Sequence, residues 1–442
     1  MVTVRTLSGD EFSPDLPGRL LKIAGDIRAA GGRAFLVGGW VRDAMLGKSC
    51  RDYDIEVYDM AQDALVPLLS KYGRTNLVGK AFGVIHLAMK GLSLDFSFPR
   101  TENKVGYGHR GFVVHTDEKL SFKEAALRRD FTINAMGMEL PELTLCDPYG
   151  GVDDLKAHRL KHVSDAFAED SLRILRGVQF ASRFELTLAP ETAELCRSLS
   201  LEDLSKERIY EEFKKWLLKP GKPSLGLRAF LEMDLLRFFP EVKPLDGSYE
   251  KLGQFLDNMS RNAAAEPEES RMAMAFASLL SGNSCAEDWE KFLTGMTNEV
   301  KLLRNVPKLL KYTSTASPEG AFLDDSEIRR LSVALEGLRE YSILVASNPM
   351  YGEQARTAFV ERLKARALEL GVFENAPEPY LTGRYLMSLG LKPGKQFGDL
   401  IRESFELQLD GKLQDAEQAA PSADTTITLA FSSTGSSSGL AR

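Results

Sequence analysis

Asp52 and Asp54 lie two residues apart in the segment RDYDIEVY (residues 51–58). Residues i and i+2 of an extended strand point to the same face, so both carboxylates can reach one metal ion. In LSLDFSF (residues 92–98) the apolar residues alternate strictly, which places Asp95 on the polar face of a neighbouring strand. Carboxylates suit Mg²⁺, which completes its shell with phosphates and water. Three of them can support two ions ~3.5–4 Å apart, one activating a hydroxyl and one stabilising a leaving pyrophosphate.

A phosphate-binding turn precedes these aspartates. The segment FLVGGWVRD (residues 35–43) reads as an apolar strand, two glycines and a short helix. Gly38 and Gly39 let backbone N–H groups approach a phosphate, the helix N-terminus favours negative charge, and Arg42 offers a fork of donors. Two aspartates at this spacing are, by themselves, more often solvent-exposed acidic side chains, and a diglycine by itself is often only a turn. Together, the two features predict a nucleotide-binding site.

The combination LVGGWVRDAMLG (residues 36–47) and RDYD (residues 51–54) resembles a family signature. The family is that of the class II tRNA nucleotidyltransferases and bacterial poly(A) polymerases, within the DNA polymerase β superfamily. Three later segments resemble the same family in the same order, so the likeness extends from about residue 33 to 217. The resemblance implies a nucleotidyltransferase head that holds the carboxylates.

The first later segment, RRDFTINAM (residues 128–136), resembles the motif that binds the ribose and phosphates of the incoming nucleotide. Asp130 and Asn134, four apart, would share a helix face and read the 2′-hydroxyl, and Arg129 would reach a phosphate. Taken alone, the segment also fits a capped amphipathic helix with a basic start.

The second segment, EDSLRILR (residues 169–176), resembles the amino-acid template of the family. Asp170 and Arg173, three apart on a helix, present an acceptor beside a donor fork, and Arg176 continues the basic row. Cytosine and adenine show an amino donor beside a ring-nitrogen acceptor, whereas uracil and guanine reverse the pattern, so this pair selects C and A. Such a pair is otherwise usually a surface ion pair, and the motif order supports the template interpretation.

The third segment, ERIYE (residues 207–211), resembles the motif that closes the neck, where Glu207 and Arg208 would brace the template helix rather than touch substrate. One position departs from the family pattern. Gln179 stands where the family commonly has another arginine, and Arg183 is the candidate to supply that phosphate contact instead.

A polar, glycine-punctuated segment, residues 100–111, looks like the flexible loop of the family, which favours enzymes that finish with A. His109 lies there, and a loop histidine is more often solvated than catalytic. All five histidines precede residue 163, so the C-terminal half cannot carry the His-Asp phosphohydrolase domain of some bacterial relatives.

Basic residues of the C-terminal half are the candidates for RNA contacts: Lys301, Arg304, Lys308, Lys392 and Lys395. The first three share one side of a predicted helix and would contact the RNA backbone, although Pro307 interrupts the run and a basic stripe is often only a solvated face. Residues 380–394 resemble the tail domain of bacterial CCA-adding enzymes, where one of the last two lysines would take a phosphate beside a helix N-terminus.

The elements that must position these residues change in kind along the chain. The pattern predicts strands at 34–37, 52–58, 84–89 and 92–98, and helices at 17–30, 61–72, 168–184 and 206–218. We therefore predict an α+β fold, a small mixed-sheet nucleotidyltransferase head followed by an all-helical neck, body and tail. The expected bounds are head 1–140, neck 141–219, body 220–374, tail 375–417 and a mobile stretch 418–442.

Composition sets few limits on function. The net charge of −7, averaged over the chain, argues against a nucleic-acid partner. Binding depends on how the charge is distributed, however, and basic residues recur in local runs at 206–228 and 301–311. The four cysteines form no CxxC pair, which indicates neither a disulfide framework nor a zinc site. The sequence shows no signal peptide and no membrane-spanning stretch, so we expect a cytoplasmic protein.

With the resemblance, these features predict template-independent addition of C, C and A to the 3′ end of tRNA from CTP and ATP, with Mg²⁺. A poly(A) polymerase on the same head and neck, or a nucleotidyltransferase that adds only A, are the alternatives. The lack of a long basic extension favours tRNA. A non-catalytic RNA-binding homologue is a further alternative, against which the intact Asp52, Asp54 and Asp95 argue. The oligomeric state is not determined by the sequence.

Overall fold

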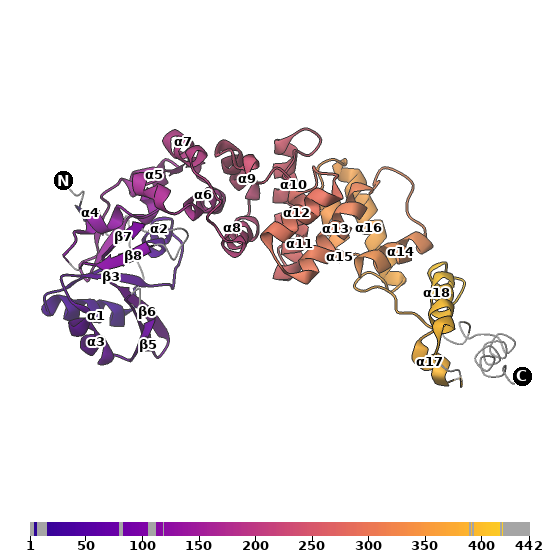
Figure 1. Cartoon of the computed structure of the whole chain (residues 1–442), viewed down its shortest axis with the longest axis horizontal. Coiled ribbons are helices and arrows are strands. Elements are labelled where there is room, and N and C mark those ends of the chain that lie inside the picture. Colours follow the sequence, from indigo (N-terminus) through magenta and orange to yellow (C-terminus); the bar gives the residue numbers. More distant parts are fainter. Residues whose placement is uncertain are drawn as a thin grey trace, which may run out of the picture. The chain divides into compact units, whose positions relative to one another are not determined.

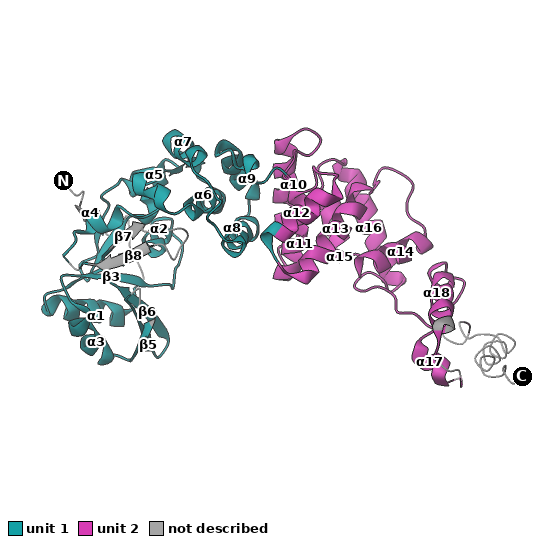
Figure 2. Ribbon diagram, viewed as in Figure 1, with its two compact units in different colours: residues 1–240, 295–297 teal, residues 241–294, 298–442 magenta. Residues whose placement is uncertain are grey.

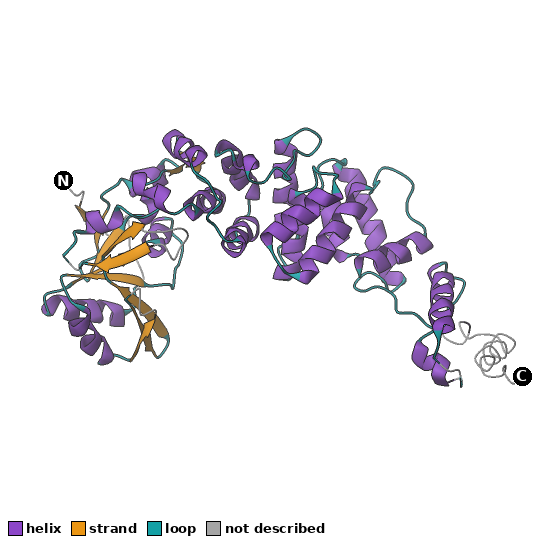
Figure 3. Ribbon diagram, viewed as in Figure 1, coloured by secondary structure: helices purple, strands orange, loops and turns teal. Residues whose placement is uncertain are grey.

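The computed structural model describes residues 4–6, 16–78, 83–104, 112–117, 119–388, 390, 393–415 and 418 (Figure 1). The chain divides into two compact units, residues 1–240 with 295–297 and residues 241–294 with 298–442 (Figure 2). The described strands all lie in the first unit, and the second is built of helices (Figure 3). The predicted α+β fold is therefore confirmed.

The head is built on one mixed sheet with the strand order β1-β10-β9-β2-β3-β6-β5-β4. Its strands are β1 (Val4–Thr6), β2 (Arg33–Val37), β3 (Asp54–Tyr58), β4 (Arg74–Val78), β5 (Val84–Met89), β6 (Leu92–Ser97), β9 (Gly137–Leu140) and β10 (Thr144–Cys146). Only the β3–β6 pair among these is parallel. Strands β7 (Arg100–Lys104) and β8 (Phe112–Thr116) form a separate antiparallel pair.

Short helices surround this sheet. They are α1 (Gly18–Ala29), α2 (Gly39–Met45), α3 (Gln62–Ser70) and α4 (Phe122–Ala126), with the 3₁₀ turn η2 (Thr132–Asn134). Helix α1 buries Leu20, Ile23 and Ile27 at helical spacing, as its sequence pattern predicted. On β2 and β3 the core side chains include Phe35 and Ile55, both fully buried. The C-terminal end of β2, which leads into the glycine turn, and the N-terminal end of β3, which begins at Asp54, line the cavity described below.

The neck follows in the same unit. It contains α5 (Gly151–Lys156), η3 (Asp165–Glu169), α6 (Leu172–Arg183), α7 (Pro190–Ser198), α8 (Lys206–Leu218), α9 (Pro223–Glu232) and η4 (Leu235–Arg237). The expectation of a purely helical neck was wrong in one detail, because β11 (Arg159–Leu160) and β12 (Thr187–Leu188) pair in parallel. The amide of Thr187, the first residue of β12, and that of Ala189, just after it, donate to the carbonyls of His158 and Leu160 and so satisfy these backbone groups.

An aromatic core joins α9 to α8. The rings of Trp216 and Phe230 stack with centroids 5.7 Å apart, and the Trp216 indole donates to the Pro223 carbonyl at 2.9 Å. A Cβ added to Gly226 would lie 2.2 Å from the Trp216 nitrogen, so only glycine permits this approach. Helix α9 is thereby held in the first unit, and the boundary between the compact units falls at 240/241.

The second unit is an array of helices. They are α10 (Tyr249–Asn262), α11 (Glu268–Leu279), α12 (Ala286–Met296), α13 (Val300–Ser314), α14 (Asp325–Leu335), α15 (Arg339–Ser347), α16 (Glu353–Glu369), α17 (Gly383–Ser388) and α18 (Lys395–Leu409). Helix α18 contacts α14 through ion pairs of Arg330 with Glu406 and Asp410, each 2.8 Å long. No helix in the described part of the chain is long and apolar enough to cross a membrane.

Most predicted elements are present with small differences in their bounds. The strand predicted at 52–58 begins at Asp54, so Asp52 lies in the preceding coil. The helix predicted at 168–184 begins at Leu172, because Asp170 has the extended backbone angles φ −128° and ψ 104°. Strands β1, β4, β7, β8, β9 and β10 were not predicted, and β7 occupies the start of the predicted loop at 100–111.

Candidate active site

One cavity of about 840 Å³ in the first unit collects residues from the glycine turn, the two carboxylate-bearing segments, the RRD motif and the template segment. All of the predicted catalytic and nucleotide-binding residues line it: Gly38, Gly39, Arg42, Asp52, Asp54, Asp95, Arg129, Asp130, Asn134, Asp170, Arg173 and Arg176. These residues span 139 positions of sequence, from 38 to 176, so only the fold brings them together. Gln179 and Arg183 also lie on its wall.

Two of the three predicted catalytic carboxylates lie side by side at one end of the cavity because of strand pairing. The parallel pairing of β3 with β6 sets Asp54 directly beside Asp95, and Asp52 lies two residues before Asp54. Asp54 is exposed at the cavity surface, yet the surrounding protein displaces water from it. This desolvation, followed by the charge of Asp95, raises the pKa of Asp54, and Arg129 only partly offsets the rise. His86, which sequence reasoning missed, contacts Asp95 with Nδ1 2.6 Å from Oδ1.

The donor set at this end fits a magnesium ion completed by its substrate. Among the residues with described positions, no three His, Cys, Asp or Glu side chains converge into a metal-binding group by themselves. Mg²⁺ is commonly bound by one or two carboxylates plus substrate phosphates, so a complete protein cage is not required. Desolvation is the main cause of the raised pKa of Asp54, and the negative charges of Asp95, Asp52 and Glu56 add to it; a divalent cation bound here would offset those charges.

The glycine turn packs against Arg129. Gly38 has φ +67° and ψ −125°, a backbone conformation that L side chains rarely adopt, and a Cβ placed there would lie 3.1 Å from Arg129 Nη1. Glycine is therefore required both by the backbone and by the guanidinium. The turn and Arg129 together present donors to the same part of the cavity.

Arg42, the predicted phosphate ligand, is bound by protein groups in the structure. Its side chain is nearly buried, its Nη1 donates to Asn134 Oδ1 at 2.6 Å, and its other nitrogens donate to Asp43. The guanidinium also lies 4.1 Å from the ring centre of Phe184 at the end of α6. Burial lowers the pKa of Arg42. These contacts join α2 to the neck, and the phosphate contact of Arg42 stays a prediction.

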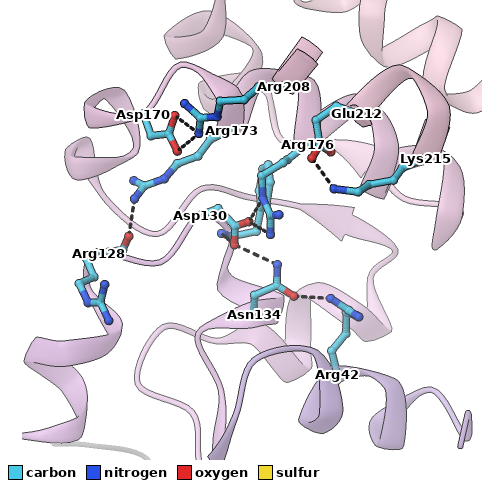
Figure 4. Close-up of polar contacts among 11 residues, drawn as sticks. Arg42, Arg128, Asp130, Asn134, Asp170, Arg173, Arg176, Arg208, Glu212 and Lys215 are labelled. Atoms are coloured by element: carbon cyan, nitrogen blue, oxygen red, sulfur yellow. Dashed lines mark hydrogen bonds and ion pairs between the residues drawn. The ribbon is translucent and has the colours of Figure 1, made fainter. Parts of the chain in front are cut away.

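A polar chain runs from this arginine to α6 (Figure 4). Asn134 Nδ2 donates to Asp130 Oδ1 at 2.9 Å, and Arg176 donates to Asp130 Oδ2 through Nε at 2.8 Å and Nη2 at 2.7 Å. Burial alone would raise the pKa of Asp130, but Arg176, Asn134 and the Phe131 amide outweigh it and hold that pKa below its ordinary value.

The predicted α-helix across Asp130 and Asn134 was wrong. Phe131 is extended, with φ −124° and ψ 150°, and only a single 3₁₀ turn follows over Thr132–Asn134. The Thr132 amide donates to the Lys161 carbonyl instead of continuing a helix. The two polar side chains still meet, because the turn folds Asn134 back onto Asp130.

The predicted template residues do not pair with each other in the structure (Figure 4). Asp170 accepts hydrogen bonds from Arg208 at 3.1 and 3.2 Å. Arg173 instead donates to the carbonyls of Ala166, at 2.5 Å, and Arg128, at 2.8 Å. The predicted bracing residue thus contacts the template acceptor directly, and both template side chains are held by protein groups while they line the cavity.

The predicted RNA contacts on α13 form ion pairs. Lys301 lies 3.1 Å from Glu269, and Arg304 and Lys308 lie 3.0 and 2.9 Å from Glu336. The helix runs through Pro307 without a break. Their positive charges are therefore partly neutralised by this unit's own carboxylates.

Several predicted features fall outside the described residues. These are Lys392, His109 with most of the predicted loop at 100–111, and the stretch 418–442 apart from Gln418. Lys395 is the first residue of α18.

Other polar residues of the cavity were missed by sequence reasoning: Glu56, Arg128, Lys215 and Lys219. Two signals were available for them. Glu56 continues the alternation that begins at Asp54, and the two lysines are four apart within the basic run at 206–228. Lys215 contacts the buried Glu212 at 2.8 Å, and Lys219 is exposed.

Comparison with known proteins places these features in a family. The model of the poly A polymerase head domain matches residues 34–161, and that of the probable RNA- and SrmB-binding site of polymerase A matches residues 185–245. The chain is 40% identical to a multifunctional CCA protein of Chromobacterium violaceum over 220 residues, 48% of this chain and 51% of that protein. It is 39% identical to the Xanthomonas campestris protein of the same name over 223 residues, 49% and 52% of the two chains. The chain spans about half the length of these curated relatives.

Solved structures match over nearly the whole chain. A complex of CCA-adding enzyme with ATP has a TM-score of 0.67 at 23% identity and covers 100% of both chains. The Thermotoga maritima CCA-adding enzyme complexed with tRNA has a TM-score of 0.62 at 22% identity and covers 96% of this chain and 97% of that one. At this identity the likeness shows the fold. Residues 34–161 therefore match the poly A polymerase head domain, in agreement with the family that the motifs predicted, and the chain has the fold of the CCA-adding enzymes.

Proposed function

We propose that this protein adds C, C and A to the 3′ end of tRNA from CTP and ATP, without a nucleic-acid template. The observation that carries the proposal is the single cavity in which Asp52, Asp54 and Asp95 share a wall with Asp170 and Arg173. It is supported by the multifunctional CCA proteins among the relatives and by the fold of the CCA-adding enzymes. These comparisons do not favour the poly(A) or A-only alternatives. Acting on tRNA would place the protein in the cytoplasm.

The reaction joins the RNA 3′-oxygen to the α-phosphorus of the nucleotide. The 3′-hydroxyl loses its proton, the new P–O bond forms, and the bond to the β-phosphate breaks to release pyrophosphate. Asp52, Asp54 and Asp95 would hold Mg²⁺, which supplies activation of the hydroxyl and stabilisation of the leaving pyrophosphate when bound. Gly38 and Arg129 would bind the triphosphate.

Selection of C and A would require an exchange of partners. Asp170 would accept the exocyclic amino group, and Arg173 would donate to the ring nitrogen. In the structure these groups bind Arg208 and two backbone carbonyls instead. An entering cytosine or adenine offers matching replacements, whereas uracil would leave both groups mismatched. Recognition would therefore depend on how strongly the base hydrogen-bonds to this pair, relative to the protein hydrogen bonds that it replaces.

RNA would approach the cavity from a cationic wall. Lys215 and Lys219 of α8 and Arg183 of α6 line this wall and would contact backbone phosphates near the 3′ end. Contacts by Lys301, Arg304, Lys308, Lys392 and Lys395 remain part of the proposal. Those on α13 would have to compete with the ion pairs to Glu269 and Glu336.

The test offers the full chain three RNAs with labelled CTP or ATP and Mg²⁺: tRNA lacking CCA, tRNA ending in CC, and an unrelated RNA. Two C residues followed by one A on the first RNA support the proposal. Addition of A to the CC substrate alone, or long A tails on any RNA, contradicts it. The variant Asp52→Ala/Asp54→Ala should lose incorporation, and Asp153→Ala, an exposed aspartate of α5, is the matched control.

A further inference from the structure

A buried carboxylate lies on the same strand face as Asp54. Side chains two apart on a strand project to the same side, so Asp54, Glu56 and Tyr58 share one face of β3. Glu56 belongs to the cavity lining but is only 3% exposed. A buried carboxylate is costly unless charged or polar partners compensate it. The partners that compensate the buried charge of Glu56 therefore indicate its role.

Three side chains meet the two oxygens of Glu56. The Tyr58 hydroxyl donates to Oε2 at 2.7 Å. On the other oxygen, Oε1 lies 3.4 Å from Arg129 Nη2 and 3.6 Å from Arg128 Nη2. Each arginine side chain is about one-fifth exposed, at 20%. One buried carboxylate thus faces two guanidinium groups that line the cavity.

The two arginines lead to different parts of the site. Arg129 Nη1 packs against the glycine turn at Gly38, so its guanidinium lies between that turn and Glu56. The Nε of Arg129 is buried and has no hydrogen-bond partner among the described residues. The contact of its Nη2 with Glu56 therefore helps to fix the orientation of the guanidinium. The Arg128 carbonyl accepts a hydrogen bond from Arg173. Arg129 connects Glu56 to the glycine turn that is proposed to bind the triphosphate. Arg128 connects Glu56 to Arg173, which is proposed to select the base.

We propose that Glu56 is a positioning residue that holds Arg128 and Arg129 toward the triphosphate of the incoming nucleotide. The inference rests on the proposed function. A direct role as a metal ligand is disfavoured, because Tyr58 occupies one oxygen and two guanidiniums face the other. A divalent cation at the same carboxylate would be repelled by both arginines.

The test compares Glu56→Gln, which keeps the shape and removes the charge, with a matched control. Glu139→Gln is that control. In the sheet, Phe35 lies between Glu56 on β3 and Glu139 on β9. Glu139 also accepts hydrogen bonds from an arginine, at 2.7 Å from Arg33 Nε and 3.0 Å from Arg33 Nη2. Glu139 is not part of the cavity lining.

Steady-state incorporation with CTP and with ATP gives the main measurement. For Glu56→Gln we expect the nucleotide KM to rise on the order of tenfold, the equivalent of one missing charged interaction, with a smaller change in kcat. Glu56→Asp should recover part of the loss because it restores the charge. Tyr58→Phe should have a smaller effect because the charge stays. Glu139→Gln should leave KM and kcat at their wild-type values.

Three results would overturn the inference. One is an unchanged KM in Glu56→Gln with only a lower melting temperature, which would make Glu56 purely structural. Another is a larger rise in the half-saturating Mg²⁺ concentration than in KM, which would make it a metal ligand. A third is an equal loss in Glu139→Gln. If the wild type extends none of the three RNAs, the proposed function fails, and equilibrium binding of labelled ATP without RNA still tests Glu56: unchanged affinity in Glu56→Gln overturns the inference.

Discussion

The ion pair between Asp130 and Arg176 should contribute strongly to the stability of the first unit. Arg176 donates to one carboxylate oxygen through two nitrogens, at 2.8 and 2.7 Å, and the Asp130 side chain is only 9% exposed. Replacing Arg176 with Met keeps the bulk of the side chain and removes both bonds. Asp130 would retain the Phe131 amide and Asn134 as donors.

The burial of the Asp130 carboxylate sets the expected loss of stability. Removing one partner of a buried pair costs about 3–5 kcal/mol, because an uncompensated charge remains. Arg176 is 35% exposed, so water can reach part of the vacated space, and we expect the lower end, about 3 kcal/mol. For a unit of this size about 1 kcal/mol shifts Tm by roughly 2–4 °C, so the transition of the first unit should fall by roughly 6–12 °C.

A double-mutant cycle isolates the pair. Wild type, Arg176→Met, Asp130→Asn and the double variant are unfolded in urea at pH 7 and followed by tryptophan fluorescence. The first unit contains Trp40 and Trp216, and its transition is fitted separately because two units need not unfold together. We expect a coupling free energy of about 2 kcal/mol or more.

The sign of the pH dependence gives a second check. The pKa of Asp130 is depressed in the folded protein, so its stabilisation is fully present above its unfolded pKa and is lost as pH falls through the folded value. A coupling below about 0.5 kcal/mol, as for exposed pairs, would refute the reasoning. So would a coupling that grows as the pH is lowered.

Three further predictions concern the cavity. Gly38→Ala should destabilise the protein by about 1–3 kcal/mol through its positive φ and weaken ATP binding, as measured by urea unfolding and equilibrium binding; wild-type values for both would contradict the geometry. Desolvation and Asp95 raise the pKa of Asp54, so the ionised form destabilises the metal-free fold, and Asp54→Asn should raise its Tm at pH 7 while abolishing incorporation. That gain should shrink as pH falls through the raised pKa and vanish below the ordinary pKa of an aspartate, and a lower Tm at pH 7 would count against the prediction. Arg208→Ala should free Asp170 and change the CTP-to-UTP incorporation ratio; an unchanged ratio would show that Arg208 does not influence selection.

Local patterns made much of the head predictable. Alternation identified β6 and the face of Asp95, and the diglycine marked the turn whose positive φ requires Gly38. The strands β4, β9 and β10 were missed, because they depend on pairing with neighbours rather than on a strong pattern of their own. The helix predicted over Asp130 and Asn134 failed for the same reason, since a distant carbonyl, that of Lys161, captures a backbone amide.

The sequence by itself determined which residue types lie near each other along the chain, and hence the motifs, their order and the chemistry they can perform. The tertiary structure decided which partner each charged group takes. Asp170 binds Arg208, 38 positions away, rather than Arg173, and Arg42 binds Asn134, 92 positions away. Spacing cannot settle such choices, because several arginines could reach each carboxylate and the packing of α6, α8 and the sheet selects one. The same long-range packing sets Asp54 beside Asp95, and the cavity depends on it.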